Sequence, residues 1–330
     1  MFVSQATIWV IIYLKDPDNS GPGIQRSTNS LIIGEMIVDF VPSICPGEAL
    51  ITALESDGSN PRNIQTTLKY WRTLPESRIT IDFRNPGAEE QFDELENLEE
   101  AHPVVIHDIR GTPNERFTLG KNGFQYIDDP VPEYDEMWDE KRVESFFLPR
   151  TEALVRDLTG ATRVLVYTHR IRCQPSGPRS PAHIVHADFT PAGALQHLRT
   201  LLPPSEFAHL QETDTRILAL NIWRPLQTVT KDPLAVCDWS SISPEAEIVP
   251  NRFIFSDGWS EVAKVLFSKR HRWWYCSSQC PDEVVVFKQY DSAEGERGSS
   301  VVHSAFVDPD YEDDEPRRSL EVGVFVFLQI

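Results

Sequence analysis

The chain has 330 residues, of which 40% are hydrophobic and 10% aromatic, so it can bury a large core in one β-rich domain, with or without an extension. Its 50 acidic side chains outnumber its 31 Lys and Arg side chains and give a formal net charge of −19 at pH 7. A phosphate backbone or an anionic membrane surface would repel this charge. We therefore expect no nucleic-acid or membrane partner.

The cysteines do not form a disulfide pattern. Five cysteines in a chain of this length are an odd number without dense spacing, which favours a reducing compartment. No second Cys/His pair with zinc-type spacing follows Cys276 and Cys280, so we interpret both as ordinary strand and turn residues. The apolar run Ile8–Leu14 is too short to cross a bilayer, and no basic stretch precedes it. We expect a cytoplasmic protein without a targeting segment.

The first 65 residues differ in pattern from the rest of the chain. Two short apolar runs, Ile8–Leu14 and Leu31–Val41, are separated by a segment rich in Asp, Ser, Gly and Pro, and no chemical motif is recognisable there. A strand-like sequence at Thr66–Trp71 begins a more coherent pattern. The sequence thus predicts an N-terminal extension of unknown role at residues 1–65 and one domain at residues 66–330.

Two acidic stretches and a helix follow the first predicted strand. The stretches Glu89–Glu100 and Asp128–Glu140 are typical of solvated helix faces or loops. Apolar spacing predicts a helix over Thr151–Leu158, which Gly160 ends. The β-branched run Thr162–Thr168 then predicts a strand.

A second helix is predicted by its start signal. Thr190 followed by Pro191 is a cap residue followed by a favoured first-turn residue. The apolar pattern continues to about Leu202, and we expect Pro203 and Pro204 to end the helix.

The part of the chain after Thr215 consists of short β-rich runs separated by turn residues. The predicted strands are Ile217–Trp223, Leu234–Cys237, Arg252–Phe255, Arg272–Cys276, Glu283–Tyr290, Val301–Phe306 and Leu320–Leu328. Many short strands indicate a sandwich or barrel, with the preceding helices packed outside. We predict a mainly β fold with flanking helices around a double-stranded β-helix, the jelly-roll core of cupin-like proteins.

The first chemical signal is the sequence His186-Ala187-Asp188. A strand places residues i and i+2 on one face, so this imidazole and carboxylate would point the same way. Non-haem iron oxygenases use two His and one carboxylate on one side of the metal, and His303 in VVHSAF can supply the third ligand. An H-x-D match alone is common by chance, so its support must come from other residues.

That support comes from Arg317 and Ser319. A cosubstrate that such an iron site can use is 2-oxoglutarate, which chelates the metal through its 2-oxo and adjacent carboxylate groups and leaves a distal carboxylate to be bound. A guanidinium binds a carboxylate bidentately, and a serine hydroxyl adds one donor. Arg318 is the competitor, but it would face the other way and has no serine at i+2. We predict that Arg317 and Ser319 bind the cosubstrate.

The chain also resembles a known family over Thr66 to Ile330. The resemblance rests on the motifs TTLKYW, HPVVIHDIRG, NGFQY, THRIR, PAHIVHADFT, NIWRPL, LAVCD, VFKQYDS, HSAF and PRRSLEV. In these the chain is similar to the fungal gibberellin-desaturase-like oxygenases, relatives of the hydroxylase of cephamycin biosynthesis.

This resemblance implies a jelly-roll enzyme that uses Fe(II), 2-oxoglutarate and O2 and releases succinate and CO2, with ascorbate as a candidate reductant. It implies a small secondary-metabolite substrate that is hydroxylated, desaturated or oxidatively cyclised. Family members usually carry Arg where this chain has Gly323, which leaves the reaction outcome open.

Seven further residues are candidate substrate contacts because of their strand position or charge: His169, Arg172, Asn221, Trp223, Arg224, Lys288 and Tyr290. Strand alternation would put Asn221 with Trp223, and Lys288 with Tyr290, on shared faces. A core or surface role is the ordinary alternative for each of them. His107 and His183 are interpreted as non-ligand histidines.

Two other functions fit the same fold. A jelly roll can be a non-catalytic binding module, or a cupin-type metal enzyme that does not use 2-oxoglutarate. Neither needs a buried clamp for a carboxylate, so the Arg317-x-Ser319 pair argues against both. We expect a monomer or a homodimer that acts on a small molecule.

Overall fold

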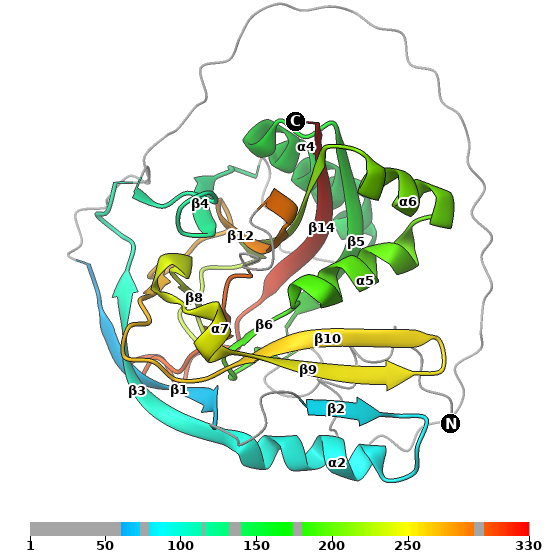
Figure 1. Cartoon of the computed structure of the whole chain (residues 1–330). Coiled ribbons are helices and arrows are strands. Elements are labelled where there is room, and N and C mark those ends of the chain that lie inside the picture. Colours follow the sequence, from blue (N-terminus) through cyan, green and yellow to red (C-terminus); the bar gives the residue numbers. More distant parts are fainter. Residues whose placement is uncertain are drawn as a thin grey trace, which may run out of the picture.

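Two curved sheets form most of the described chain (Figure 1). The computed structural model describes residues 61–72, 79–113, 116–131, 140–173, 180–293 and 300–329. The nine-stranded sheet has the order β1 (Ile64–Trp71), β3 (Glu99–Asp108), β11 (Trp273–Tyr275), β8 (Leu234–Cys237), β13 (His303–Ala305), β6 (His186–Ala187), β10 (Gly258–Val265), β9 (Ile248–Phe255) and β2 (Ile79–Asp82). The five-stranded sheet has the order β4 (Phe124–Asp128), β12 (Glu283–Asp291), β7 (Thr215–Pro225), β14 (Ser319–Gln329) and β5 (Arg163–Arg172).

The inner faces of the two sheets enclose one pocket, as in a jelly roll. His186 and His303 come from the nine-stranded sheet, whereas Asn221, Trp223 and Phe287 come from the five-stranded sheet, and all five side chains line this pocket. The pairing is antiparallel except between β3 and β11 and between β2 and β9. The predicted jelly-roll core is therefore confirmed.

The outer face of the five-stranded sheet is covered by helices. Alternate apolar residues of β7, β12 and β14 pack there against Val143, Phe147 and Val155 of a continuous helical segment. This segment comprises α3 (Glu140–Arg142), the π-helical turn η3 (Val143–Phe147) and α4 (Leu148–Thr159). Burial of these side chains gives the sheet its second hydrophobic layer, because each strand alternates between a pocket face and a helix face.

Local sequence signals fix the ends of two helices. α4 ends at Gly160, whose φ of 69° lies in the left-handed region that glycine tolerates. α5 (Pro191–Leu201) begins after Thr190, whose Oγ1 accepts a hydrogen bond from the Gly193 amide at 3.0 Å. Both predictions are confirmed. The sequence pattern did not predict α6 (Pro204–Glu212). Pro204 was expected only to end the preceding helix, but a proline is equally suited to the first turn of a new one.

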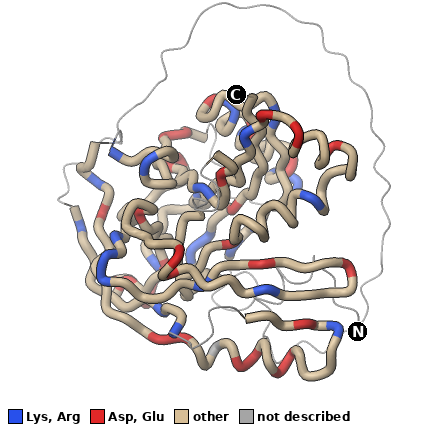
Figure 2. Tube along the Cα trace, in the orientation of Figure 1, with Lys and Arg blue, Asp and Glu red and all other residues tan. Residues whose placement is uncertain are grey.

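A small second core lies under the long β9–β10 hairpin. Here β2 and α2 (Ala88–Glu94) pack on the hairpin through Ile81, Phe253 and Phe255, and the turn η1 (Leu95–Leu98) follows α2. The acidic stretch from Glu89 is partly the solvated face of α2, as expected, and Figure 2 shows acidic residues along this helix. Its last two residues, however, begin β3. The sequence pattern did not predict β10, in which the buried residues Glu261, Val262 and Ala263 are consecutive and do not alternate with exposed ones.

One predicted boundary and one predicted solvated stretch differ in the structure. The boundary between residues 65 and 66 falls inside β1, which begins at Ile64. In the second acidic stretch, Asp129 is not a solvated residue, because it forms ion pairs with Arg150 and Arg224. Residues 132–139 of that stretch, and residues 1–60, lie outside the described residues. In the part of the chain that is described, no helix is both long and apolar enough to span a membrane.

Candidate metal centre and adjoining pocket

Two strands bring His186, Asp188 and His303 together. His186 lies in β6 opposite His303 of β13, and Asp188 immediately follows β6. The Asp188 Oδ1 atom is 3.6 Å from His186 Nε2 and 3.8 Å from His303 Nε2. One ligand atom from each residue lies within 4.8 Å of the others. Three donors at this spacing can bind one metal ion from one side.

Hydrogen bonds orient both imidazole rings. His186 Nδ1 lies 2.7 Å from the Ile184 carbonyl oxygen, and His303 Nδ1 lies 3.1 Å from the Val301 carbonyl oxygen. A carbonyl oxygen only accepts, so each Nδ1 carries the hydrogen and each Nε2 presents its lone pair to the cluster. Metal-binding histidines are commonly held in this way.

The protonation states also suit a metal ion. Burial, together with the neighbouring His186, lowers the pKa of His303 to about 4, so this imidazole is neutral near pH 7. Burial alone would raise the pKa of Asp188, but His303, His186 and Arg172 outweigh it and hold the pKa below its usual range. Neutral imidazoles and an ionised carboxylate are the forms that bind divalent metals.

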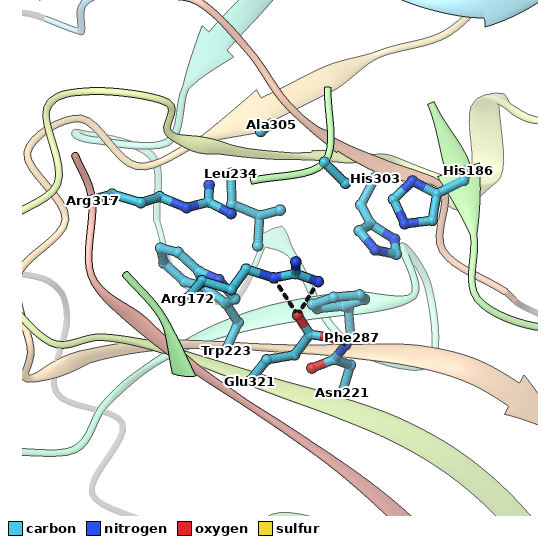
Figure 3. A pocket seen from close by; sticks show the side chains of 11 residues that line it. Arg172, His186, Asn221, Trp223, Leu234, Phe287, His303, Ala305, Arg317 and Glu321 are labelled. Carbon is cyan, nitrogen blue, oxygen red and sulfur yellow. Dashed lines mark hydrogen bonds and ion pairs between the residues drawn. The ribbon is translucent and has the colours of Figure 1, made fainter. Parts of the chain in front are cut away.

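The pocket extends from the two histidines to Arg317 (Figure 3). Arg317 is only 3% exposed, donates a hydrogen bond from Nη1 to the Asp232 carbonyl oxygen, and lies 5.3 Å from the centre of the Trp223 ring. Arg318 is exposed, and its own carbonyl oxygen accepts a hydrogen bond from the Leu226 amide at 2.8 Å. The structure therefore brings Arg317, and not Arg318, to the pocket.

Ser319, two residues after Arg317, and Asn221 on the pocket wall provide buried polar atoms. Ser319 is fully buried in β14, and no described residue hydrogen-bonds to its Oγ. Asn221 and Trp223 both line the pocket, as strand alternation predicted. Among the described residues the Asn221 Oδ1 and Trp223 Nε1 atoms also have no hydrogen-bond partner. Buried polar atoms of this kind commonly meet a ligand or ordered water.

Sequence reasoning missed Glu321, which faces the same pocket. Glu321 Oε2 accepts hydrogen bonds from Arg172, and Oε1 accepts one from Asn221 Nδ2 at 3.3 Å. Burial alone would raise the pKa of Glu321, but the charges of Arg172 and Arg170 outweigh this and lower it. The available signal was strand alternation, because Glu321 continues the i, i+2 series of Arg317 and Ser319.

A β-bulge separates the predicted pair Lys288 and Tyr290. The register passes from Lys288 opposite Leu220 to Tyr290 opposite Ala219, so the two side chains lie on opposite faces of β12. Lys288 forms an ion pair with Asp291 at 3.1 Å, and Tyr290 packs in an apolar cluster. Neither residue lines the pocket, and the prediction that they share a face is wrong.

Gln289, on the same face of β12 as Phe287, lies beside the metal-ligand cluster. Gln289 Oε1 accepts a hydrogen bond from the Asp188 amide at 3.3 Å and another from Ser300 Oγ at 3.4 Å. Strand alternation was the available signal, because Gln289 continues the i, i+2 series of Val285 and Phe287, and Phe287 lines the pocket.

Arg224 and His169 also lie away from the pocket. Arg224 is buried on the helix-facing side of β7, where it pairs with Asp129 and donates to the Pro281 carbonyl oxygen at 2.8 Å. His169 lies opposite Val322, a residue of the cluster that packs against the helices. Strand alternation puts both on the face opposite Arg172 and Trp223. Of the seven candidate substrate contacts, the structure brings Arg172, Asn221 and Trp223 to the pocket.

The fold and the site define a jelly-roll protein with a His-Asp-His cluster at one end of a pocket and Arg317 at the other. A family model described as "Oxidoreductase/YMDC permease-like domain" matches residues 68–327. The chain is 30% identical to the hydroxylase/desaturase efuI of Hormonema carpetanum, over 81% of this chain and 95% of that protein. It is 37% identical to the hydroxylase/desaturase asaB of Aspergillus flavus, over 81% of this chain and 96% of that protein.

Relatives with a named cosubstrate agree with this match. The chain is 32% identical to the Fe(II)/2-oxoglutarate-dependent dioxygenase nvfI of Aspergillus novofumigatus, over 68% of this chain and 83% of that protein. The solved structure of the iron and alpha-ketoglutarate-dependent endoperoxidase NvfI superposes with a TM-score of 0.66 at 27% identity, over 81% of this chain and 99% of that one. The chain belongs to the family of iron(II)- and 2-oxoglutarate-dependent dioxygenases that contains these fungal proteins. It is an oxidoreductase that uses iron(II), 2-oxoglutarate and O2.

Proposed function

We propose that His186, Asp188 and His303 hold the iron, and that Arg317 with Ser319 binds the distal carboxylate of 2-oxoglutarate. The observation that carries this proposal is the placement of the three-ligand cluster and the buried Arg317 along one pocket (Figure 3). When bound, iron and 2-oxoglutarate supply the oxidising chemistry, in which O2 is consumed and succinate and CO2 are released. A guanidinium at the far end matches the free carboxylate of this cosubstrate.

The residues of the chain would position these groups. The two imidazoles are fixed by their Nδ1 hydrogen bonds and both line the pocket, so a metal held by this cluster would be accessible to ligands that enter the pocket. Phe287 packs 4.9 Å from the His303 ring, and Leu234 and Trp223 add apolar surface that excludes water. Exclusion of water strengthens the attraction between Arg317 and a carboxylate.

The proposed substrate is a small secondary metabolite that is hydroxylated, desaturated or oxidatively cyclised. Two relatives are named hydroxylase/desaturase, and a related solved structure is named an endoperoxidase, which supports this range of outcomes. The pocket offers the acceptor Asn221 Oδ1 and the aromatic surface of Trp223 to such a molecule.

We further propose that the enzyme works in the cytoplasm as a monomer or homodimer, with ascorbate as a reductant. All the cysteines in the described residues, Cys173, Cys237, Cys276 and Cys280, are free, which supports a reducing compartment.

Iron dependence is the direct test of the proposed function. Purified full-length protein is expected to convert 2-oxoglutarate to succinate when Fe(II) is supplied, because the cluster holds the metal that the cosubstrate chelates. Excess chelator should stop the reaction, and added Fe(II) should restore it. Succinate formation that continues in excess chelator would contradict the iron assignment.

The segment before Pro61 is proposed to be dispensable for the chemistry. The proposed metal ligands begin at His186, and the described hydrogen bonds of the domain begin at Arg62. A chain beginning at Pro61 is therefore expected to keep the melting temperature and the rate of succinate formation of the full chain. If this shortened chain is soluble and binds iron but has no turnover, the segment helps to form the active site.

A chain beginning at Thr66 is the matched control. It lacks Arg62, which pairs with Asp308 at 2.8 Å and accepts a hydrogen bond on its carbonyl oxygen from Tyr275 at 2.7 Å. It also lacks the buried Ile64. We expect it to melt at a lower temperature than the chain that begins at Pro61.

A further inference from the structure

Arg172, Glu321 and Asn221 form a polar cluster on the pocket wall, in which Arg172 and Asn221 are buried and Glu321 is partly buried. They come from the neighbouring strands β5, β14 and β7, and all three line the pocket (Figure 3). Arg172 Nε lies 3.0 Å and Nη2 lies 2.9 Å from Glu321 Oε2, and Arg172 Nη1 donates to the Ser180 carbonyl oxygen at 2.9 Å. The guanidinium is therefore held in one orientation.

Stability alone does not explain an ion pair at this place. Two buried charges lose their hydration, and well-packed apolar residues would often stabilise a fold as much. The same sheet contains a second buried pair, between Arg224 and Asp129, on its helix-facing side. Of these two ion pairs, only Arg172–Glu321 faces the pocket that would receive the cosubstrate. Only this pair can therefore act on a ligand.

The pocket thus contains two guanidinium groups, and 2-oxoglutarate contains two carboxylates. Figure 3 draws the Arg172 guanidinium between that of Arg317 and the imidazole of His303, and all three residues line one pocket. We propose that Arg172 attracts the carboxylate of 2-oxoglutarate next to the metal, its 1-carboxylate, and that Glu321 is a positioning residue that orients Arg172. This inference rests on the proposed binding of the cosubstrate by Arg317.

The balance of charge supports this role. Arg172 and Arg317 are the two guanidinium groups lining the pocket, the partly buried Glu321 is an anionic group of its wall, and the buried Asp188 belongs to the metal-ligand cluster. These four charges cancel, so a dianionic cosubstrate and a divalent metal can enter together without leaving net charge in a buried space. Without Arg172, Glu321 would repel the incoming dianion.

Glu321 is itself held at both carboxylate oxygens. Arg172 binds Oε2, and Asn221 Nδ2 donates to Oε1 at 3.3 Å. Because Glu321 can move little, the guanidinium of Arg172 is oriented before the cosubstrate arrives, and less conformational entropy is lost on binding.

Two ligands separate the two arginines in an anaerobic titration of the Fe(II)-loaded enzyme. The first is 2-oxoglutarate, and the second is 2-oxopentanoate, which keeps the 1-carboxylate and the 2-oxo group but lacks the distal carboxylate. Binding is followed by the metal-to-ligand charge-transfer absorbance. Arg172→Gln is expected to weaken both ligands by the same factor of about 10 to 100. Arg317→Gln should weaken 2-oxoglutarate strongly and 2-oxopentanoate little.

The positioning role of Glu321 predicts an intermediate result. Glu321→Gln keeps the shape of the side chain but removes the charge that fixes Arg172, so both ligands should bind several-fold more weakly, and Glu321→Asp should restore part of the affinity. Asp129→Asn is the matched control, because it disturbs the Arg224 pair on the far face of the same sheet. It should lower the melting temperature without changing either affinity.

Arg172→Gln alone leaves the charge of Glu321 unpaired, which can prevent folding. The double variant Arg172→Gln/Glu321→Gln removes both charges and replaces the single variant in the test if that variant does not fold. If folded Arg172 variants bind 2-oxopentanoate as tightly as the unaltered enzyme, the inference is overturned while the proposed function stands. If the unaltered Fe(II)-loaded enzyme binds neither ligand, the proposed function itself fails.

Discussion

Substitution of His186 by alanine is expected to abolish iron binding and succinate formation. The imidazole would be one of three protein ligands, and its Nε2 is held toward the other two by the hydrogen bond from Nδ1 to the Ile184 carbonyl oxygen. Loss of groups that merely orient a metal ligand typically reduces affinity or activity by about 10- to 100-fold, so loss of a ligand should exceed about 100-fold. Metal content after reconstitution and the rate of succinate formation measure both effects.

His303→Ala should behave in the same way, because His303 lies opposite His186 in the sheet and provides the third ligand atom. His209→Ala is the control, since this histidine is exposed on α6, far along the chain from the proposed ligands. It should leave iron content and rate unchanged. Full iron content in purified His186→Ala protein would show that the metal lies elsewhere.

Arg317→Ala is expected to raise the concentration of 2-oxoglutarate required for half-maximal rate by about 100- to 1000-fold. Removal of one partner from a buried charge-assisted contact costs several kcal/mol, and each factor of ten corresponds to about 1.4 kcal/mol. Arg317 is 3% exposed and its guanidinium lies over Trp223, so water cannot replace it fully. Steady-state rates of succinate formation as a function of 2-oxoglutarate concentration give the effect.

Arg318→Ala is the matched control, because this side chain is the next along the chain and is exposed. It should change the 2-oxoglutarate requirement little. Equal effects of the two substitutions would contradict the assignment of Arg317. An unchanged requirement in a folded Arg317→Ala protein would also contradict it.

Local sequence determined the ends of two helices and the alternation of side chains along a strand. Gly160 ends α4 because its backbone adopts a positive φ, and Thr190 caps α5 through its own hydroxyl. Strand alternation likewise placed Asn221 and Trp223 together on the pocket wall. These predictions needed no contact between distant segments.

The metal-ligand cluster was predictable for a similar reason, but only in part. His186 and Asp188 are two residues apart next to a strand, so their proximity is a property of the local backbone. The place of His303 beside them depends on the pairing of β13 with β6, which joins segments more than a hundred residues apart. His303 was predicted because an iron centre needs a third ligand, and the structure shows that strand pairing places it beside His186 and Asp188.

Tertiary structure decided the face of β12 on which Tyr290 lies. Lys288 and Gln289 keep the alternation of the strand, so Lys288 faces the helices and Gln289 faces Asp188, whereas the bulge after Lys288 turns Tyr290 to the side of Ala219. A single extra residue in a strand is not visible in a hydrophobic pattern, because the partner strand sets the register.

The sequence by itself determined a jelly-roll fold, the chemistry of a His-Asp-His cluster and the choice of Arg317 over Arg318, because period, capping and strand alternation are local. Only the tertiary structure decided that Arg172 meets Glu321 inside the pocket and that Arg224 meets Asp129 behind the sheet. Both arginines are buried and both are paired. What distinguishes them is the face of the sheet on which each lies, and that face is set by the packing of one sheet against the other and against the helices.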